Sequence, residues 1–69
     1  MMGEQQDIIG KRVKEEREKK QLSQEKLAAA AGLSSRTILN IEQGSNSPTT
    51  DTLVQLSRAL EVPLARLME

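Results

Sequence analysis

One face of a short helix, predicted over residues 35–43, carries a set of hydrogen-bonding side chains. At about 100° per residue, Ile38 and Ile41 define the buried direction of this helix. The opposite face carries Ser35, Arg36, Asn40 and Gln43, with Leu39 beside them. Arginine fits the edge of guanine, asparagine that of adenine, and serine either edge. This face therefore has the chemistry to read base pairs, although polar residues also cover the outer face of any exposed helix.

Composition excludes several other kinds of site. The chain contains no histidine and no cysteine, which removes the usual zinc ligands and the usual general base. We therefore expect no metal, no cofactor and no catalytic residue. Phenylalanine, tyrosine and tryptophan are also absent, which excludes the base stacking used by proteins that bind single-stranded nucleic acids.

The charge balance is neutral, with 10 basic and 10 acidic residues. Nucleic-acid-binding domains usually carry a basic excess, so one copy of this chain should bind DNA weakly and dimerisation should matter. The charged run KRVKEEREKK, residues 11–20, is interpreted mainly as a solvated helix face. The alternative is that a few of its lysines and arginines contact phosphates.

Length and hydropathy indicate one domain, residues 1–69, in the cytoplasm. A chain of 69 residues fits a single domain. No apolar run approaches the ~18 residues that a membrane span needs, and the N-terminus lacks the apolar segment of a signal peptide. We expect no contact with a membrane.

Capping residues and hydrophobic spacing predict five short helices. They cover about residues 7–20, 24–31, 35–43 and 50–60, and a fifth begins at Pro63. The expected N-caps are Asp7, Ser23, Ser34 and Thr49. Gly32 and Gly44 are expected to end the second and third helices. Residues 1–6 are expected to be disordered.

The inward-facing residues of these helices can enclose one core. Residues 28–31 are four alanines, which favour a helix and leave room for another helix to cross closely. The core is predicted to contain Ile9, Val13, Leu22, Leu27, Ile38, Ile41, Leu53, Leu56, Leu60, Leu64 and Leu67, with Met68 also facing inward. We therefore predict an all-α fold, a compact bundle of five short helices in which residues 24–43 form a two-helix unit.

The order and spacing of apolar, capping and glycine residues also carry a family resemblance. The matching residues are Ile9, Gly10, Arg17, Leu22, Ser23, Gln24, Leu27, Ala28, Ala31, Gly32, Ile38, Ile41, Glu42, Gly44, Pro48, Leu53, Leu56, Ala59, Leu60, Val62, Pro63 and Leu64. As an ordered set they resemble the repressor-type helix-turn-helix family of phage and bacterial regulators, the phage repressor, Cro-like and XRE group. The resemblance implies a lambda-repressor-like bundle with its helix-turn-helix at residues 24–43.

The resemblance also implies roles for individual residues. Base contacts are expected from Ser34, Ser35, Arg36 and Asn40. Contacts with the DNA backbone are expected from Gln24, Gln43, Ser45 and Asn46. Arg17 and Glu42 are expected to form a partly buried ion pair that joins the first helix to the end of the third.

By this resemblance we expect a transcriptional regulator, such as a repressor, that binds double-stranded DNA with its third helix in the major groove. It should act as a homodimer on an inverted repeat, with the fourth and fifth helices as the contact surface. Antitoxins and other partner-binding proteins use the same fold, so a protein-interaction module is the alternative. An enzyme is not expected.

Three residues depart from the family pattern. Gln21 stands where many relatives have glycine, Glu16 where an apolar residue is frequent, and Leu39 where relatives are often polar. Residues 44–49 and 62–64 are similar to those of regulators that carry a ligand-sensing cupin domain after this module. The chain stops at Glu69, so we expect no sensor domain and no small-molecule ligand in this domain.

Overall fold

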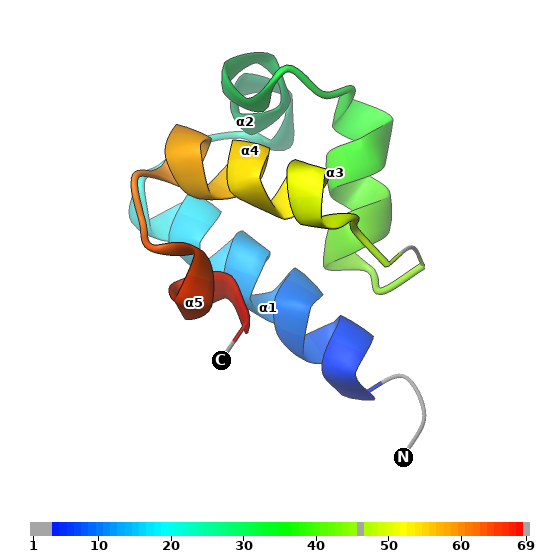
Figure 1. Cartoon of the computed structure of the whole chain (residues 1–69). Helices are drawn as coiled ribbons and strands as arrows, with labels where there is room; N and C mark the ends of the chain where they lie inside the picture. The colour runs from blue at the N-terminus through cyan, green and yellow to red at the C-terminus, as the bar shows by residue number, and fades with distance from the viewer. Residues whose placement is uncertain (1–3, 46, 69) are drawn as a thin grey trace.

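The computed structural model describes residues 4–45 and 47–68. The helices are α1 (Glu4–Lys19), α2 (Gln24–Ala31), α3 (Ser35–Glu42), α4 (Thr50–Leu60) and α5 (Leu64–Met68), and no strand occurs within these ranges. Figure 1 shows α4 across the middle of the molecule, α2 above it, α3 at the right, and α1 and α5 below. This arrangement confirms the predicted all-α bundle. None of the helices in the described ranges is long and apolar enough to cross a membrane.

The first helix begins earlier than the sequence pattern predicts. Asp7 lies inside α1, so its assignment as an N-cap is wrong. Glutamate and glutamine are good helix formers, and residues 4–6 contain no glycine or proline that would stop the helix before Asp7. Within the segment expected to be disordered, residues 4–6 are helical, and residues 1–3 lie outside the described residues.

The starts of α2, α3 and α4 are capped as predicted. Each cap is a hydroxyl residue with extended backbone, whose side-chain oxygen accepts a hydrogen bond from the amide three positions later. The pairs are Ser23 with Lys26 at 3.0 Å, Ser34 with Thr37 at 3.1 Å, and Thr49 with Thr52 at 3.2 Å. These bonds fix the residues at which the two helices of the 24–43 unit begin.

The first four helices all end at a residue with left-handed backbone. These residues are Gln21, Gly32, Gly44 and Glu61, with φ of 58°, 73°, 76° and 59°. In each case the amide of the next residue donates to a carbonyl five positions earlier, which closes the helix end. Glycine adopts this backbone without steric cost. Gln21 carries a side chain there, so its departure from the family pattern costs about 1–2 kcal/mol.

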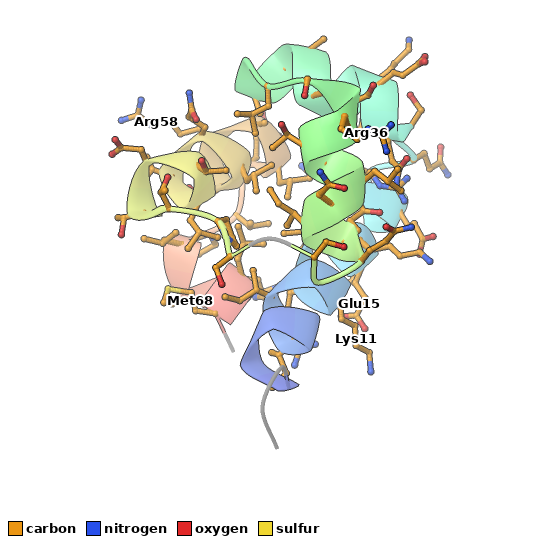
Figure 2. All side chains as sticks on the ribbon, turned by 90° about the vertical axis from the view of Figure 1, so that its right-hand side faces the viewer. Lys11, Glu15, Arg36, Arg58 and Met68 are labelled. Atoms are coloured by element: carbon orange, nitrogen blue, oxygen red, sulfur yellow. The ribbon has the colours of Figure 1, made fainter. Side chains whose placement is uncertain are left out.

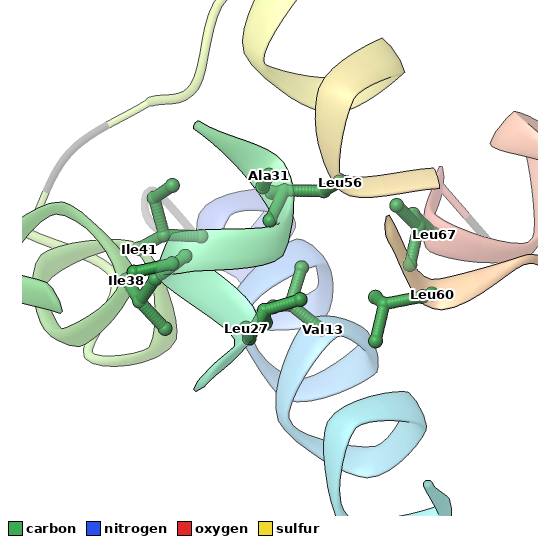
Figure 3. Close-up of a cluster of buried hydrophobic side chains, with 9 residues drawn as sticks. Val13, Leu27, Ala31, Ile38, Ile41, Leu56, Leu60 and Leu67 are labelled. Atoms are coloured by element: carbon green, nitrogen blue, oxygen red, sulfur yellow. The ribbon is translucent and has the colours of Figure 1, made fainter. Parts of the chain in front are cut away.

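The hydrophobic core lies between the five helices (Figure 3). The buried apolar residues are Val13, Leu27, Ala28, Ala31, Ile38, Ile41, Leu53, Leu56, Leu60 and Leu67, and Ile9 and Leu22 pack against them partly buried. Leu64 is only half-buried. Met68 is 57% exposed, so the prediction that it faces inward is wrong. The reason is the length of α5: in five residues it places one side chain, Leu67, in the core.

A buried glycine sets the distance between α1 and α3. A Cβ atom at Gly10 would overlap the backbone carbonyl oxygen of Ile41 and lie 2.9 Å from that of Glu42. The backbone of α1 therefore packs directly against the last turn of α3. No larger residue fits at this position without moving one helix away from the other.

Glu16 is buried at the contact between α1 and α5. Only 5% of the residue is exposed. Relatives often have an apolar residue at this position, and a carboxylate here is expected to leave the core with fewer apolar contacts. Its Oε2 atom lies 3.4 Å from Nζ of Lys19 and 3.6 Å from Nη1 of Arg66. The buried charge is thus partnered, and it links α5 to α1.

Candidate functional site

The helix α3 is buried along one side and open along the other. Ile38 and Ile41 are 0% and 2% exposed and pack into the core. On the other side Ser35, Arg36 and Gln43 are exposed, while Leu39 and Asn40 are half-buried. Figure 2 looks onto α3 and shows Arg36 near its upper end. The structure thus places the predicted polar set on the free side of α3.

The four predicted base-contacting residues differ in how far their side chains are engaged. The Ser34 hydroxyl caps α3 and shares a 2.8 Å hydrogen bond with the hydroxyl of Thr37. By contrast, the side chains of Ser35, Arg36 and Asn40 form no hydrogen bond with the residues that the structure describes. Three of the four side chains are therefore available to a ligand, and their contact with bases stays a prediction.

The predicted backbone contacts lie at both ends of the two-helix unit. Gln43 caps the end of α3 and is exposed, and Ser45 is exposed in the loop that follows. Asn46 lies outside the described residues. Gln24, the first residue of α2, is half-buried, and its Nε2 atom donates a 3.0 Å hydrogen bond to Oε1 of Glu42. Sequence reasoning assigned Gln24 to phosphate alone and missed this second contact.

Arg17 and Glu42 form a two-pronged ion pair between α1 and the end of α3. Nε of Arg17 lies 2.7 Å from Oε2 of Glu42, and Nη2 lies 3.2 Å from Oε1. The Arg17 side chain is 12% exposed and that of Glu42 is 4% exposed. Nη1 of Arg17 also donates to the carbonyl oxygen of Leu22 at 2.8 Å. One guanidinium thus joins α1, the turn before α2 and the last turn of α3.

The pair keeps Arg17 charged. The hydrogen bond to Glu42 is the largest influence on the pKa of Arg17 and raises it, and the negative charges of Glu42 and Glu18 raise it further against the opposing effect of burial. The guanidinium is therefore protonated at any pH at which the protein would be handled. Its geometry with the carboxylate, two parallel N–H donors facing two oxygens, restricts the angle between α1 and α3.

Two features near α3 were not found from the sequence. Lys11 and Glu15 lie on α1 beside the end of α3 (Figure 2), and Glu15 is paired with Arg12 at 2.9 Å. A shallow cleft of about 230 Å³ separates α3 from the start of α4 and is lined by Thr37, Ile41, Ser47, Pro48, Thr49 and Thr52. Helical periodicity shows which face of a helix is exposed, but not which neighbouring helix flanks it.

Within the described ranges, no group of three potential metal ligands occurs.

Comparison with known proteins relates this arrangement to a family. A family model described as helix-turn-helix, HTH_3, matches residues 13–67. Among solved structures, the restriction-modification controller protein C.AhdI from Aeromonas hydrophila matches with a TM-score of 0.88 and 31% identity over 90% of this chain and 94% of that chain. The competence regulator ComR from Streptococcus vestibularis matches with a TM-score of 0.84 and 38% identity over 91% of this chain. This chain spans only 21% of the ComR chain. The clp gene regulator ClgR from C. glutamicum shares the fold. It matches with a TM-score of 0.85 and 21% identity over 90% of this chain and 80% of that chain. A comparison with curated proteins gave no match.

Proposed function

The chain belongs to the HTH_3 helix-turn-helix family, and on this premise we propose that it binds double-stranded DNA sequence-specifically, with α3 in the major groove. The family comprises DNA-binding regulators rather than enzymes. In the proposed complex α2 lies across the DNA backbone while the exposed side of α3 faces base edges. A protein that binds DNA acts in the cell compartment that contains the DNA.

The observation that carries this proposal is the free polar side of α3. Ser35, Arg36 and Asn40 leave their hydrogen-bonding groups open to a ligand, and they match the edges of guanine and adenine. The buried ion pair between Arg17 and Glu42 supports it, because base readout needs a helix held at one angle. Leu39, half-buried on the same side, offers an apolar contact for a thymine methyl group.

We propose that two copies act together on an inverted repeat, with half-sites about one helical turn apart. The neutral net charge supports this, because one copy gains little from attraction to phosphates. Met68 and Ile8 are the large apolar residues that the described part of the chain leaves exposed. In Figure 2 Met68 lies on the side of the molecule away from Arg36. A dimer contact through α4 and α5 would cover Met68 and leave α3 free.

The comparison with C.AhdI supports a regulatory role for a chain of this size. The match covers 94% of that restriction-modification controller protein, so a protein of little more than this module can be a regulator. By analogy, we propose that the present chain regulates transcription by occupying a promoter. Whether it represses or activates depends on where its site lies.

Fluorescence anisotropy on a duplex tests the proposal. A labelled palindromic duplex, obtained by selection, is titrated with protein at several salt concentrations, and a scrambled duplex of equal length serves as the control. Phosphate contacts release counterions, so the logarithm of the affinity should fall linearly with the logarithm of the salt concentration, with a slope of about −0.9 per neutralised phosphate. A flat salt response, or equal affinity for both duplexes, would refute sequence-specific DNA binding and favour the protein-interaction module.

A further inference from the structure

The buried carboxylate of Glu16 is the charged contact between α1 and α5. Its Oε2 atom lies 3.6 Å from Nη1 of Arg66, which belongs to α5. The same oxygen lies 3.4 Å from Nζ of Lys19, which belongs to α1 like Glu16 itself. Of these two cations, Arg66 is therefore the one that connects the carboxylate to α5.

The helix α5 has few other means of attachment. It consists of five residues, and isolated helices shorter than about 12–15 residues are marginal in water. Leu67 is its one buried residue, and Leu64 is half-buried. The docking of α5 therefore depends largely on Leu67 and on the Glu16–Arg66 pair.

The two sides of this pair differ in their exposure to solvent. The Glu16 side chain is 6% exposed, whereas those of Arg66 and Lys19 are 49% and 66% exposed. Dissolved salt screens charges that solvent reaches, so it weakens the attraction of both cations. A buried carboxylate that loses its partners is unfavourable. Because Glu16 is buried where α1 meets α5, release of α5 gives it access to water, and salt therefore favours this release.

The position of Met68 depends on whether α5 is docked. Met68 follows Arg66 by two residues and is 57% exposed. While α5 is held on α1, Met68 lies on the side of the molecule away from Arg36 (Figure 2). A released segment of five residues does not keep a helix, so Met68 loses this fixed position. Contact between two copies through α4 and α5 therefore needs a docked α5.

We propose that the Glu16–Arg66 pair holds α5 on α1 and positions Met68 for contact with a second copy of this chain, so that rising salt releases α5 and weakens dimerisation. This inference rests on the proposed dimer and adds a means of controlling it. Relatives often have an apolar residue at the position of Glu16, and an apolar contact is not weakened by charge screening. The control by salt is therefore a property of this chain.

Hydrogen exchange followed by NMR, at about 0.05 and 0.5 M sodium chloride, measures the release of α5. The amides of residues 66–68 are the reporters, and that of Arg66 donates to the carbonyl oxygen of Pro63 at 3.0 Å. Their exchange should become about two- to five-fold faster at the higher salt concentration, relative to the amides of residues 54–58 in α4. An unchanged ratio would overturn the proposal.

Substitutions at both ends of the pair form a double-mutant cycle. Arg66→Ala alone should make the exchange of α5 about three-fold faster or more, but it should have little effect in combination with Glu16→Leu, because no carboxylate is left to pair. Glu16→Leu alone should slow the exchange and remove its dependence on salt. An equal effect of Arg66→Ala with and without Glu16→Leu would contradict the proposed pairing.

Arg58→Ala is the matched control for Arg66→Ala. Arg58 is also an exposed arginine, but it lies on α4 and forms no ion pair with the residues that the structure describes. Its loss should leave the exchange of α5 unchanged. Lys19→Ala removes the other cation near Glu16 without breaking the connection to α5, so its effect should be smaller than that of Arg66→Ala. The reverse order would overturn the role of Arg66.

Sedimentation equilibrium at the same two salt concentrations tests the link to a second copy. The dissociation constant of the dimer should rise with salt in the unmodified protein and vary little with salt in Glu16→Leu. If the salt dependence survives Glu16→Leu, the control by this pair is refuted while the dimer stands. A protein that remains monomeric even on its selected duplex would overturn the proposed dimer and this inference together, and leave DNA binding by one copy intact.

Circular dichroism checks that each variant folds. If Glu16→Leu does not fold, the salt dependence of exchange and the comparison of Arg66→Ala with Arg58→Ala decide the question, since neither needs a substitution at Glu16. Equal exchange of α5 in these two variants would then refute the proposal.

Discussion

Replacing Glu42 with glutamine removes one charge from the pair that joins α1 to α3, with almost no change of shape. Arg17, 12% exposed, is then left without a counter-charge. One carboxylate oxygen becomes an NH₂ group, which would face the donors of Arg17 or Gln24 instead of accepting from them. The substitution therefore turns three accepted hydrogen bonds into a mixture of bonds and clashes between donors.

The size of the effect follows from burial. Removing one partner of a buried pair costs about 3–5 kcal/mol. Arg17 retains some exposure and its bond to Leu22, so we expect a loss of about 2–4 kcal/mol. Small domains lie near the lower end of a stability range of roughly 5–15 kcal/mol. At about 4–8 °C for each kcal/mol, the melting temperature should fall by about 8–30 °C.

The assay is urea and thermal unfolding followed by circular dichroism, with Glu15→Gln as the matched control. Glu15 pairs with Arg12 at a similar distance, 2.9 Å, but both side chains are more than a third exposed, at 39% and 38%. Exposed pairs contribute about 0.2–1 kcal/mol at most, so the control should melt close to the unmodified protein. Equal losses in the two variants, or no loss in Glu42→Gln, would refute the conclusion that the pair restrains α3.

The pH dependence of this difference also follows from the pair. The pKa of Arg17 is raised in the folded protein, so its contribution to stability is fully present below the unfolded pKa and is lost only as the pH rises through the folded pKa, in strong alkali. The stability difference between the unmodified protein and Glu42→Gln should therefore stay constant from about pH 7 to 9. A difference that vanished within this range would mean that Arg17 is not the partner responsible.

Three further substitutions test separate parts of the account. Arg36→Ala should relax preference at one base pair at a cost of about 1–3 kcal/mol, measured by anisotropy on base-substituted duplexes; an equal loss on every duplex would make Arg36 a phosphate contact. Gly10→Ala should destabilise the fold by about 1–3 kcal/mol through overpacking, since its Cβ meets the backbone of Ile41; an unchanged urea midpoint would contradict the close packing of α1 on α3. Gln21→Gly relieves the left-handed residue after α1, but glycine loses more backbone entropy on folding, so stability should rise by only about 0.5–1 kcal/mol; a lower melting temperature would show that the side chain contributes there.

Local signals in the sequence predicted most helix boundaries. The bounds of α4 follow from Thr49, whose hydroxyl caps the helix, and from the apolar spacing of Leu53, Leu56 and Leu60. The misplaced start of α1 has a physical reason: an acidic residue is favourable as an N-cap and also within the first turns of a helix. Asp7 alone therefore could not distinguish the two positions.

Contacts between helices were harder to predict from the sequence. The family resemblance predicted the pairing of Glu42 with Arg17, but no feature of the sequence indicated the hydrogen bond from Gln24 to Glu42, two residues that are 18 positions apart. The close approach at Gly10 depends on how α1 crosses α3, and a pattern of residue types contains no crossing angle. The prediction that Met68 faces inward was also wrong, because a helix of five residues buries less than its apolar content suggests.

Binding-site selection from random duplex DNA directly tests whether the exposed side of α3 reads base pairs. We expect enrichment of an inverted repeat whose half-site centres lie about 10 base pairs apart. A pool that, after repeated rounds with the folded protein, shows no sequence enriched over the starting DNA would contradict it.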